Sequence, residues 1–377
     1  MTANPLQRLH ELGQSIWYDY IRRDLFSSGK LERLIREDAL TGMTSNPTIF
    51  QKAIAEGELY DEDIRRLGGE GRDTQRVFEG LAVDDVRRAA DFFRPVYDST
   101  GGDDGFVSIE VGPHLALDTK GTIEEARRLW KACDRGNVMV KIPGTKEGVP
   151  AIRQCLEEGI NINITLLFSV PRYREVMEAF LAALESRAKA GKSLDRIRSV
   201  ASFFVSRVDT MTDKKLDAKA AGGSERERAL AKNLRGKLGI ANARIAFQAF
   251  EEIFGGSRFG GLEKKGVRRQ KPLWASTSTK DPTLPDLYYI EALIAPDTVD
   301  TMPPETLEAY RDHGDPKVRI HDDLAGAHSV FRGIAELGID EKEIFRDLED
   351  EGIRKFSDSY DSLIRTLADK QKAVGVA

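Results

Sequence analysis

Residues 106–169 decide the fold, because three apolar runs alternate there with two helix-like segments. The runs are FVSIEVG (106–112), NVMVKIP (137–143) and ININITLLFS (160–169). In the first intervening segment, Thr122 and Glu125 have the spacing of a capping box, which predicts that a helix starts at Thr122. A second helix, from 147 to 158, is expected to end at Gly159. This alternation is typical of right-handed βαβ units and predicts a parallel sheet.

The same pattern extends outward in both directions along the chain. Five further strand-like runs are SIWYDYI (15–21), ALTGMTSNP (39–47), SVASFFVSRVD (199–209), PLWASTS (272–278) and DTVDTMP (297–303). Helical segments lie between them, so the chain carries eight strands in all. Because eight parallel strands with helical connections close into a barrel, we predict an α/β fold, a (β/α)8 TIM barrel with additional helices at the C-terminus.

Two segments lie outside this pattern. Residues 210–235 are rich in charge and are broken by Gly222 and Gly223, which predicts a surface insertion between a strand and its helix. Residues 340–371 carry apolar side chains at helical spacing, which predicts helices packed on the barrel. We therefore expect a single α/β-barrel domain over residues 1–377.

The composition excludes several classes of protein. The 377 residues include 57 Lys and Arg against 62 Asp and Glu, a net charge of −5, which provides no basic surface for nucleic acid or an anionic membrane. The two cysteines, Cys133 and Cys155, cannot form a disulfide framework or a CxxC metal site. The segment MTANPLQRLHELGQS (1–15) lacks the unbroken apolar stretch of a signal peptide, and no apolar run has the length of a membrane span, so we expect a cytoplasmic protein.

Alternate residues of the strands separate an apolar face from a polar face. In the run at 160–169, the apolar set consists of Ile160, Ile162, Ile164 and Leu166. Across five strands, the polar set near the C-terminal end of the run consists of Asp19, Glu110, Lys141, Asn163, Thr165 and Ser202. Because the active sites of barrels lie at that end of the strands, we predict that these side chains face the lumen and form a site.

Two other interpretations place polar groups on one side of a strand. The strands could belong to an antiparallel sheet with one wet face, or Lys141 and Glu110 could form a structural ion pair. However, a parallel sheet is covered on both faces, and a buried charge is costly without a partner or a function. Burial favours the neutral form of a lysine amine, which is a nucleophile for carbonyl substrates, and neighbouring carboxylates can move its protons.

Four segments of the chain resemble transaldolases, which are class I aldolases on an α/β barrel, in the subfamily with a longer chain. These segments are GMTSNPTIF (42–50), VMVKIPGTKEGVPAI (138–152), GININITLLFSV (159–170) and SFFVSRVD (202–209), and WASTSTKDP and DTVDTMPPETL fit the later strands. The resemblance covers essentially the whole chain. It implies a pentose phosphate pathway enzyme that moves a dihydroxyacetone unit from sedoheptulose 7-phosphate or fructose 6-phosphate to an aldose phosphate. It implies a lysine Schiff base and no metal or organic cofactor.

The resemblance also implies roles for individual residues. Lys141 is expected to attack the C2 carbonyl of the ketose, and Asp19 to take the proton of the C4 hydroxyl. Glu110, with Thr165, is expected to hold the water that relays protons during imine formation. The residues expected to bind the substrate are Asn46, Thr44 and Asn163 for the dihydroxyacetone unit, and Ser202, Phe204 and Arg207 for the phosphate end.

One departure from the family concerns the phosphate. Other members have an arginine after the seventh strand, whereas this chain reads STSTKDP, so Lys280 or Ser278 is expected to take its place. Two alternatives to a transaldolase are a class I fructose-6-phosphate-type aldolase that releases free dihydroxyacetone and a phosphosugar-binding barrel without catalysis. A binding protein has no need for Lys141, Asp19 and Glu110 in one lumen. The partners are expected to be small sugar phosphates, and the enzyme to be a monomer or a homodimer.

Overall fold

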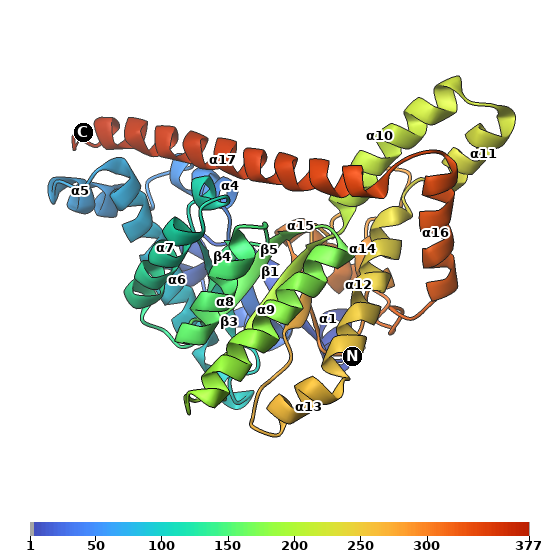
Figure 1. The fold of residues 1–377 in the computed structure, drawn as a ribbon. Helices are drawn as coiled ribbons and strands as arrows, with labels where there is room; N and C mark the ends of the chain where they lie inside the picture. The colour runs from blue at the N-terminus through green and yellow to red at the C-terminus, as the bar shows by residue number, and fades with distance from the viewer. Residues whose placement is uncertain (1–3, 377) are drawn as a thin grey trace.

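Eight parallel strands form a closed barrel in the computed structural model, which describes residues 4–376, and this confirms the predicted fold (Figure 1). The strands pair in chain order, and the first pairs with the eighth. They are β1 (Gln14–Asp19), β2 (Leu40–Thr44), β3 (Phe106–Glu110), β4 (Val138–Pro143), β5 (Ile162–Leu167), β6 (Ser199–Phe204), β7 (Lys271–Ala275) and β8 (Thr298–Met302). Each strand lies within the apolar run that predicted it or begins one residue before it.

Helices connect the strands and cover the outside of the barrel. In chain order they are α1 (Pro5–Glu11), α2 (Arg23–Ser27), α3 (Lys30–Glu37), α4 (Pro47–Ala55), α5 (Asp61–Gly69), α6 (Thr74–Ser99), the 3₁₀-helix η1 (Pro113–Leu115), α7 (Thr119–Cys133), α8 (Gly148–Glu158), α9 (Val170–Lys189), α10 (Ser206–Gly222), α11 (Glu225–Leu234), α12 (Leu238–Phe254), α13 (Ser257–Glu263), α14 (Tyr288–Ala292), α15 (Pro304–His313), α16 (Leu324–Glu336) and α17 (Glu341–Ala373). None of the helices within residues 4–376 is long and apolar enough to cross a membrane.

The predicted start of α7 at Thr122 is wrong. The helix starts at Thr119, and its N-cap is Asp118, whose carboxylate accepts hydrogen bonds from the backbone N–H groups of Lys120 and Gly121. The hydroxyl of Thr122 instead donates to the carbonyl oxygen of Leu115 at 2.9 Å. Aspartate is at least as good an N-cap as threonine, so the helix begins directly after Asp118 and not at Thr122.

The predicted alternation separates two apolar cores. The strand residues predicted to face the helices, such as Val140 and Ile164, belong to the core between sheet and helices. A second core fills the lumen, and its strand residues include Trp17, Phe106, Met139, Val200, Leu273 and Val299. The barrel is therefore plugged by side chains below its polar end, as expected for eight strands.

Leu166 is the exception to this alternation. The pairing register between β5 and β6 shifts between Ile164 and Leu167, and Leu166 has a left-handed backbone with φ of 57°. Leu166 consequently joins the lumen core, together with Phe168 that follows the strand, and Leu167 takes the place on the helix side. The apolar set predicted to face the helices included Leu166, and this prediction is wrong. One extra residue in β5 reverses which of the following residues face the lumen and which face the helices.

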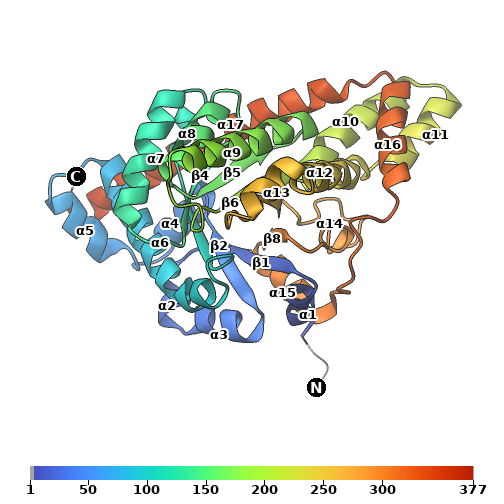
Figure 2. The same ribbon diagram turned by 60° about the horizontal axis from the view of Figure 1, so that its bottom comes forward.

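Two helical segments depart from the simple barrel (Figures 1 and 2). Helices α10 and α11 lie between β6 and α12 and project away from the barrel, in the place where the charged insertion was expected. The segment at 340–371 was expected to hold several helices, but it forms the single helix α17 of 33 residues. This helix runs across one end of the barrel, from the side of α10 and α16 to the side of α5.

Candidate active site

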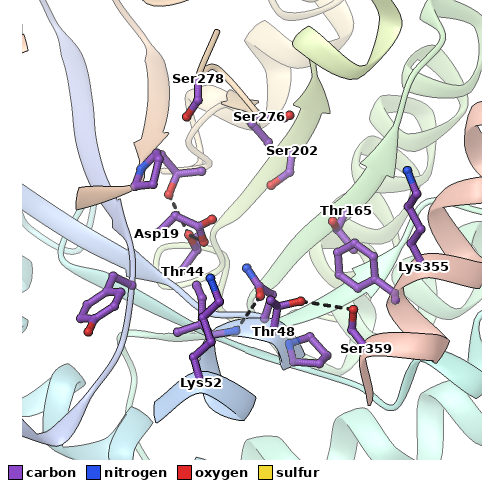
Figure 3. Close-up of a pocket in the computed structure, with 18 of the residues that line it drawn as sticks. Asp19, Thr44, Thr48, Lys52, Thr165, Ser202, Ser276, Ser278, Lys355 and Ser359 are labelled. Carbon is purple, nitrogen blue, oxygen red and sulfur yellow. Dashed lines mark hydrogen bonds between the residues drawn. The ribbon is translucent and has the colours of Figure 1, made fainter. Parts of the chain in front are cut away.

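A cavity of about 800 Å³ lies at the carboxyl ends of the strands, beneath α17 (Figure 3). Of the residues predicted from the sequence, those that line it are Asp19, Thr44, Asn46, Lys141, Thr165, Ser202, Phe204, Arg207, Ser278 and Lys280. Ser202, Ser276 and Ser278 lie on one side of the cavity, and Thr48, Lys52 and Ser359 lie on the other. Within residues 4–376, no three His, Cys, Asp or Glu side chains are grouped so that they could hold a metal ion.

The amine of Lys141 reaches this cavity from β4. Its side chain is 8% exposed, and its Nζ lies 3.8 Å from Oε1 of Glu110 on the neighbouring strand β3. The same amine donates a long hydrogen bond of 3.4 Å to the carbonyl oxygen of Ser45. Two weak contacts hold the nitrogen in place and leave it able to approach a ligand.

Glu110 is buried on the far side of that amine. It does not line the main cavity but borders a second one, of about 400 Å³, and Asn46 lies between the two. Burial and the charge of Asp19 raise the pKa of Glu110 to about 7, although Lys141 opposes the shift. Its Oε2 and the hydroxyl of Thr165 are buried and have no hydrogen-bond partner among residues 4–376. The carboxyl group of Glu110 can therefore hold and release a proton near neutral pH, and the hydroxyl of Thr165 can hold a water beside it.

Asp19 ends β1 and faces the cavity. Its Oδ1 accepts a hydrogen bond of 2.7 Å from the hydroxyl of Thr44, whose oxygen also lies 2.7 Å from that of Thr301. Burial raises the pKa of Asp19, and the charges of Lys141 and Arg207 oppose that shift. A partly buried carboxylate held by one hydroxyl, with cations nearby, is suited to accept a proton from a ligand.

The two predicted amides occupy different positions. Asn163 is fully buried next to Lys141 and does not line the cavity; its Nδ2 donates to Ser108 Oγ at 2.9 Å, and its Oδ1 accepts from Ser202 Oγ at 2.7 Å. Asn46 lines the cavity as the N-cap of α4, where its Oδ1 accepts from the backbone N–H of Ile49 at 3.1 Å. Asn46 can therefore offer its amide N–H groups to a ligand, whereas Asn163 braces the strand that carries the hydroxyl of Ser202.

Arg207 lies at the start of α10, not in a strand. The run at 199–209 was predicted as one strand, but β6 ends at Phe204 and α10 begins at Ser206. The guanidinium of Arg207 stacks over the ring of Phe204, with 5.0 Å between its Cζ and the ring centroid. Burial lowers the pKa of Arg207, and Glu351 and Asp19 oppose that shift.

This arginine is a ready partner for an anion. Among residues 4–376, no carboxylate lies within 4.0 Å of the guanidinium of Arg207, so its charge has no close ion-pair partner within the described chain. The N-terminus of α10 adds backbone N–H groups and a positive dipole end at the same place. This corner therefore offers a positive charge and backbone N–H donors, an arrangement that suits an anion such as a phosphate.

The segment after β7 contributes hydroxyls to that side of the cavity. Ser278 lies 3.0 Å from the hydroxyl of Thr306, and Lys280 lines the cavity but is exposed. Ser276, which the sequence analysis missed, has a left-handed backbone with φ of 56°, and its hydroxyl lies 2.9 Å from that of Ser206. Strained backbone at a non-glycine residue is frequent at functional sites, but no sequence pattern predicts it for a serine.

These observations agree with the comparison with known proteins. The family described as Transaldolase/Fructose-6-phosphate aldolase matches residues 16–367. The chain belongs to this family. It is 48% identical over 374 residues to the transaldolase of Thermobifida fusca, covering 98% of this chain and 99% of that protein. It is 47% identical over 384 residues to the transaldolase of Mycolicibacterium paratuberculosis, covering all of both chains. The family resemblance predicted from four segments is thereby confirmed.

Helix α17 adds residues to the site of this family member that the sequence analysis assigned only to packing. Lys355, Phe356 and Ser359 line the cavity, and the ring centroid of Phe356 lies 5.8 Å from the Nζ of Lys141. The helical spacing of Phe356 with Ile353 and Tyr360 identified an apolar stripe. It gave no information about which part of the barrel the stripe covers.

Proposed function

We propose that this chain is a transaldolase that carries a dihydroxyacetone unit on Lys141 as a Schiff base. The observation that carries the proposal is the cluster in which the buried amine of Lys141 lies 3.8 Å from Glu110 and shares a cavity with Asp19, and in which the pKa values of both carboxyl groups are raised. A sugar-binding protein gains nothing from such a cluster. A class I aldolase needs a nucleophile and two separate proton carriers.

In the proposed mechanism, Glu110 acts as the proton donor during imine formation. The unprotonated amine of Lys141 adds to the C2 carbonyl of the ketose and forms a carbinolamine. Protonated Glu110 supplies a proton, through a water held with Thr165, to the C2 hydroxyl, which leaves as water while the nitrogen lone pair forms the C=N bond. A carboxyl group with a pKa of about 7 can both give and regain this proton near neutral pH.

In the proposed mechanism, Asp19 acts as the base during carbon–carbon cleavage. The carboxylate takes the proton of the C4 hydroxyl, the C3–C4 bond breaks, and its electron pair moves through C2 to the iminium nitrogen. The aldose phosphate departs, and an enamine remains on Lys141. In the reverse direction the enamine attacks the aldehyde of an acceptor, and Asp19 returns its proton to the new hydroxyl. The protonated imine is the electron sink, so we propose that no metal or organic cofactor takes part.

The phosphate of donor and acceptor belongs near Arg207 in this proposal. The guanidinium can make two parallel charge-assisted hydrogen bonds to a phosphate. The hydroxyls of Ser202, Ser276 and Ser278 line the same side of the cavity and can complete the set, with Lys280 at the exposed edge. The dihydroxyacetone end lies toward Asn46 and Thr44, with Asn163 in support behind Ser202.

One experiment tests the Schiff base directly. Sodium borohydride added with fructose 6-phosphate reduces the imine, and peptide mass spectrometry is expected to find the adduct on Lys141 alone. The matched control is Lys141→Arg, which keeps the positive charge and is expected to give no adduct and no turnover. An adduct on another lysine, or none in the wild type, would contradict the proposal.

A second experiment separates transfer from simple cleavage, because the family includes fructose-6-phosphate aldolases. Fructose 6-phosphate is supplied with and without erythrose 4-phosphate, and sedoheptulose 7-phosphate and free dihydroxyacetone are measured. Transfer predicts sedoheptulose 7-phosphate in the presence of the acceptor and little free dihydroxyacetone in its absence. Rapid release of dihydroxyacetone without acceptor would identify an aldolase instead.

We propose one barrel domain, with α10, α11 and α17 as elaborations, acting in the cytoplasm on small sugar phosphates as a monomer or homodimer. EDTA is expected to leave the rate unchanged. A loss of activity that a divalent cation restores would contradict the metal-free mechanism.

A further inference from the structure

The amine of Lys141 lies between a polar and an aromatic surface. Asp19, Thr44 and Thr165 form the polar side of the cavity, whereas Phe204 and Phe356 line it with aromatic rings. Phe204 packs against Phe168 with 5.2 Å between ring centroids, and both belong to the lumen core. Phe356 comes from α17 and extends that core over the amine.

The position of Phe356 is fixed by contacts on both sides of it along α17. Gly352, one turn earlier, crosses the bulge of β5 so closely that an added Cβ would lie 3.1 Å from Leu166 Cδ2. Ser359, one turn later, accepts a hydrogen bond of 3.2 Å from Thr48 on α4. Farther along the helix, Lys370 donates to the carbonyl oxygen of Gly57 at 2.7 Å. These contacts hold this part of α17 over the mouth, and the ring of Phe356 packs there against the lumen core.

We propose that Phe356 determines whether the bound three-carbon unit is transferred or released, because its ring excludes water from the imine on Lys141. The inference rests on the Schiff base proposed above. After cleavage, the enamine either attacks an acceptor or is lost by hydrolysis. Hydrolysis needs a proton on the enamine carbon and a water whose oxygen bonds to C2. The C2–N bond then breaks, and dihydroxyacetone and the free amine form with a net uptake of one water.

The ring acts on this competition through its position, with its centroid 5.8 Å from the Nζ of Lys141. It occupies the volume from which water would reach C2, and exclusion of water protects reactive intermediates from hydrolysis. The acceptor aldehyde approaches from the polar side, near Asp19, so the ring hinders water and leaves transfer unobstructed.

The test is the partition of the dihydroxyacetone unit. Wild-type enzyme and Phe356→Ala are supplied with fructose 6-phosphate and erythrose 4-phosphate, and free dihydroxyacetone is measured against sedoheptulose 7-phosphate. The ratio of release to transfer is expected to rise roughly tenfold in Phe356→Ala, since the variant admits water to the imine. Phe356→Gln keeps much of the volume but is polar, and it is expected to raise the ratio as well. Phe356→Leu keeps an apolar cover and is expected to leave the ratio close to that of the wild type.

The matched control is Phe345→Ala. Phe345 lies on the same helix and packs against the same core, but it does not line the cavity. If loosening of α17 were the cause, this control would raise the ratio equally, and the inference would be overturned. An unchanged ratio in both Phe356→Ala and Phe356→Gln would also overturn it, and would point to water that arrives past Glu110.

Borohydride trapping in the same samples separates this inference from the proposed function. All four variants are expected to give the adduct on Lys141, because none of the changed residues takes part in forming the imine. Wild-type enzyme without an adduct on Lys141 would contradict the Schiff base itself. An adduct together with an unchanged partition would remove only the role of Phe356.

Discussion

The barrel lumen holds charged groups at both ends, and their pairing differs between the two. We call the N-terminal end of the strands the floor and the C-terminal end, where the cavity lies, the mouth. At the floor, Asp104 accepts hydrogen bonds from the indole N–H of Trp17 at 3.0 Å, from the hydroxyl of Ser15 and from the backbone N–H of Gly105 at 3.0 Å. Lys271 pairs with Asp103 at 2.8 Å. At the mouth, Lys141 and Glu110 remain 3.8 Å apart, and within the part of the chain that the structure describes Oε2 of Glu110 has no hydrogen-bond partner.

The difference separates stability from chemistry. Burial acts to raise the pKa of Asp103 at the floor, but Lys271 and Arg198 outweigh it and hold the pKa below its usual value. At the mouth, burial prevails and the pKa of Glu110 rises to about 7. A closely paired charge such as Lys271 with Asp103 fixes a structure, whereas a loosely paired one stays able to exchange protons and bind a ligand. Mutations at the two ends should therefore affect different measurements.

Asp19→Asn should give the largest effect, a loss of turnover without a loss of stability at the floor of the barrel. The amide keeps the shape of the side chain but cannot accept the C4 proton, so turnover should fall by roughly 10²- to 10⁴-fold, the usual contribution of a general base. In the proposed mechanism imine formation depends on Glu110 and not on Asp19, so borohydride should still trap fructose 6-phosphate on Lys141. Normal turnover would place the base elsewhere, and a folded variant that cannot be trapped would assign Asp19 to imine formation.

Asp104→Ala is the opposite case at the floor. It removes the acceptor of three hydrogen bonds and leaves the buried N–H of Trp17 unpaired. The free energy of unfolding, measured by urea denaturation, should fall by about 2–4 kcal/mol. Turnover of the folded enzyme should stay within about twofold of the wild type, since stability losses at a remote site do not act on the barrier. A large fall in turnover would show that floor and mouth are not separate.

Arg207→Ala should weaken the recognition of phosphate without unfolding the barrel. The value of kcat/KM for fructose 6-phosphate should fall by roughly 30- to 100-fold, because a charge-assisted contact to the phosphate is lost. The value for unphosphorylated fructose should barely change. Arg198→Ala, at the floor, is the control, since Arg198 is buried near Asp103 and should affect stability and not this ratio. Equal losses on both sugars would make Arg207 a structural residue.

Glu110→Gln should change a pH profile more than a maximal rate. In the proposed mechanism the proton donor is the protonated carboxyl of Glu110, so the rate of imine formation in the wild type should fall above the pKa of about 7, by about tenfold per pH unit. Glutamine cannot titrate, so this limb should disappear from the rate of borohydride trapping. A wild-type limb that survives in the variant would belong to another group.

The same substitution has a consequence for stability. The folded-state pKa of Glu110 lies above its ordinary value of 4.5, so the folded state binds the extra proton. The contribution of this group to the free energy of unfolding is therefore present below pH 4.5 and is lost as the pH rises to about 7. The difference in unfolding free energy between wild type and variant should follow that window.

The parts of the site that the sequence predicted are those that follow from local rules. A strand has a period of two, so the positions of Lys141 and Glu110 on one face can be read without knowing what lies around them. The rule fails at Leu166, where an extra residue in β5 inverts the faces, because a bulge leaves no mark in an apolar run. The end of β6 was placed too late because apolar Val205 and Val208 continue the pattern into the first turn of α10.

The contribution of α17 could not be predicted because it depends on contacts between distant segments. The helix itself follows from the spacing of its apolar residues, but its position depends on Thr48 in α4, on Leu166 in β5 and on the absence of a side chain at Gly352. Ser276 was missed for a related reason, since its left-handed backbone is imposed by the chain around it.

The order of elements along the chain gives α17 one more consequence. All eight strands precede it, and domains assemble from the N-terminal side during synthesis. The barrel can thus close on the ribosome with Lys141 in place while the mouth is still uncovered. A growing chain at that stage exposes its amine to every aldehyde and ketone in the surrounding solution. Protection arrives only when the segment carrying Phe356 leaves the ribosome and settles across the mouth.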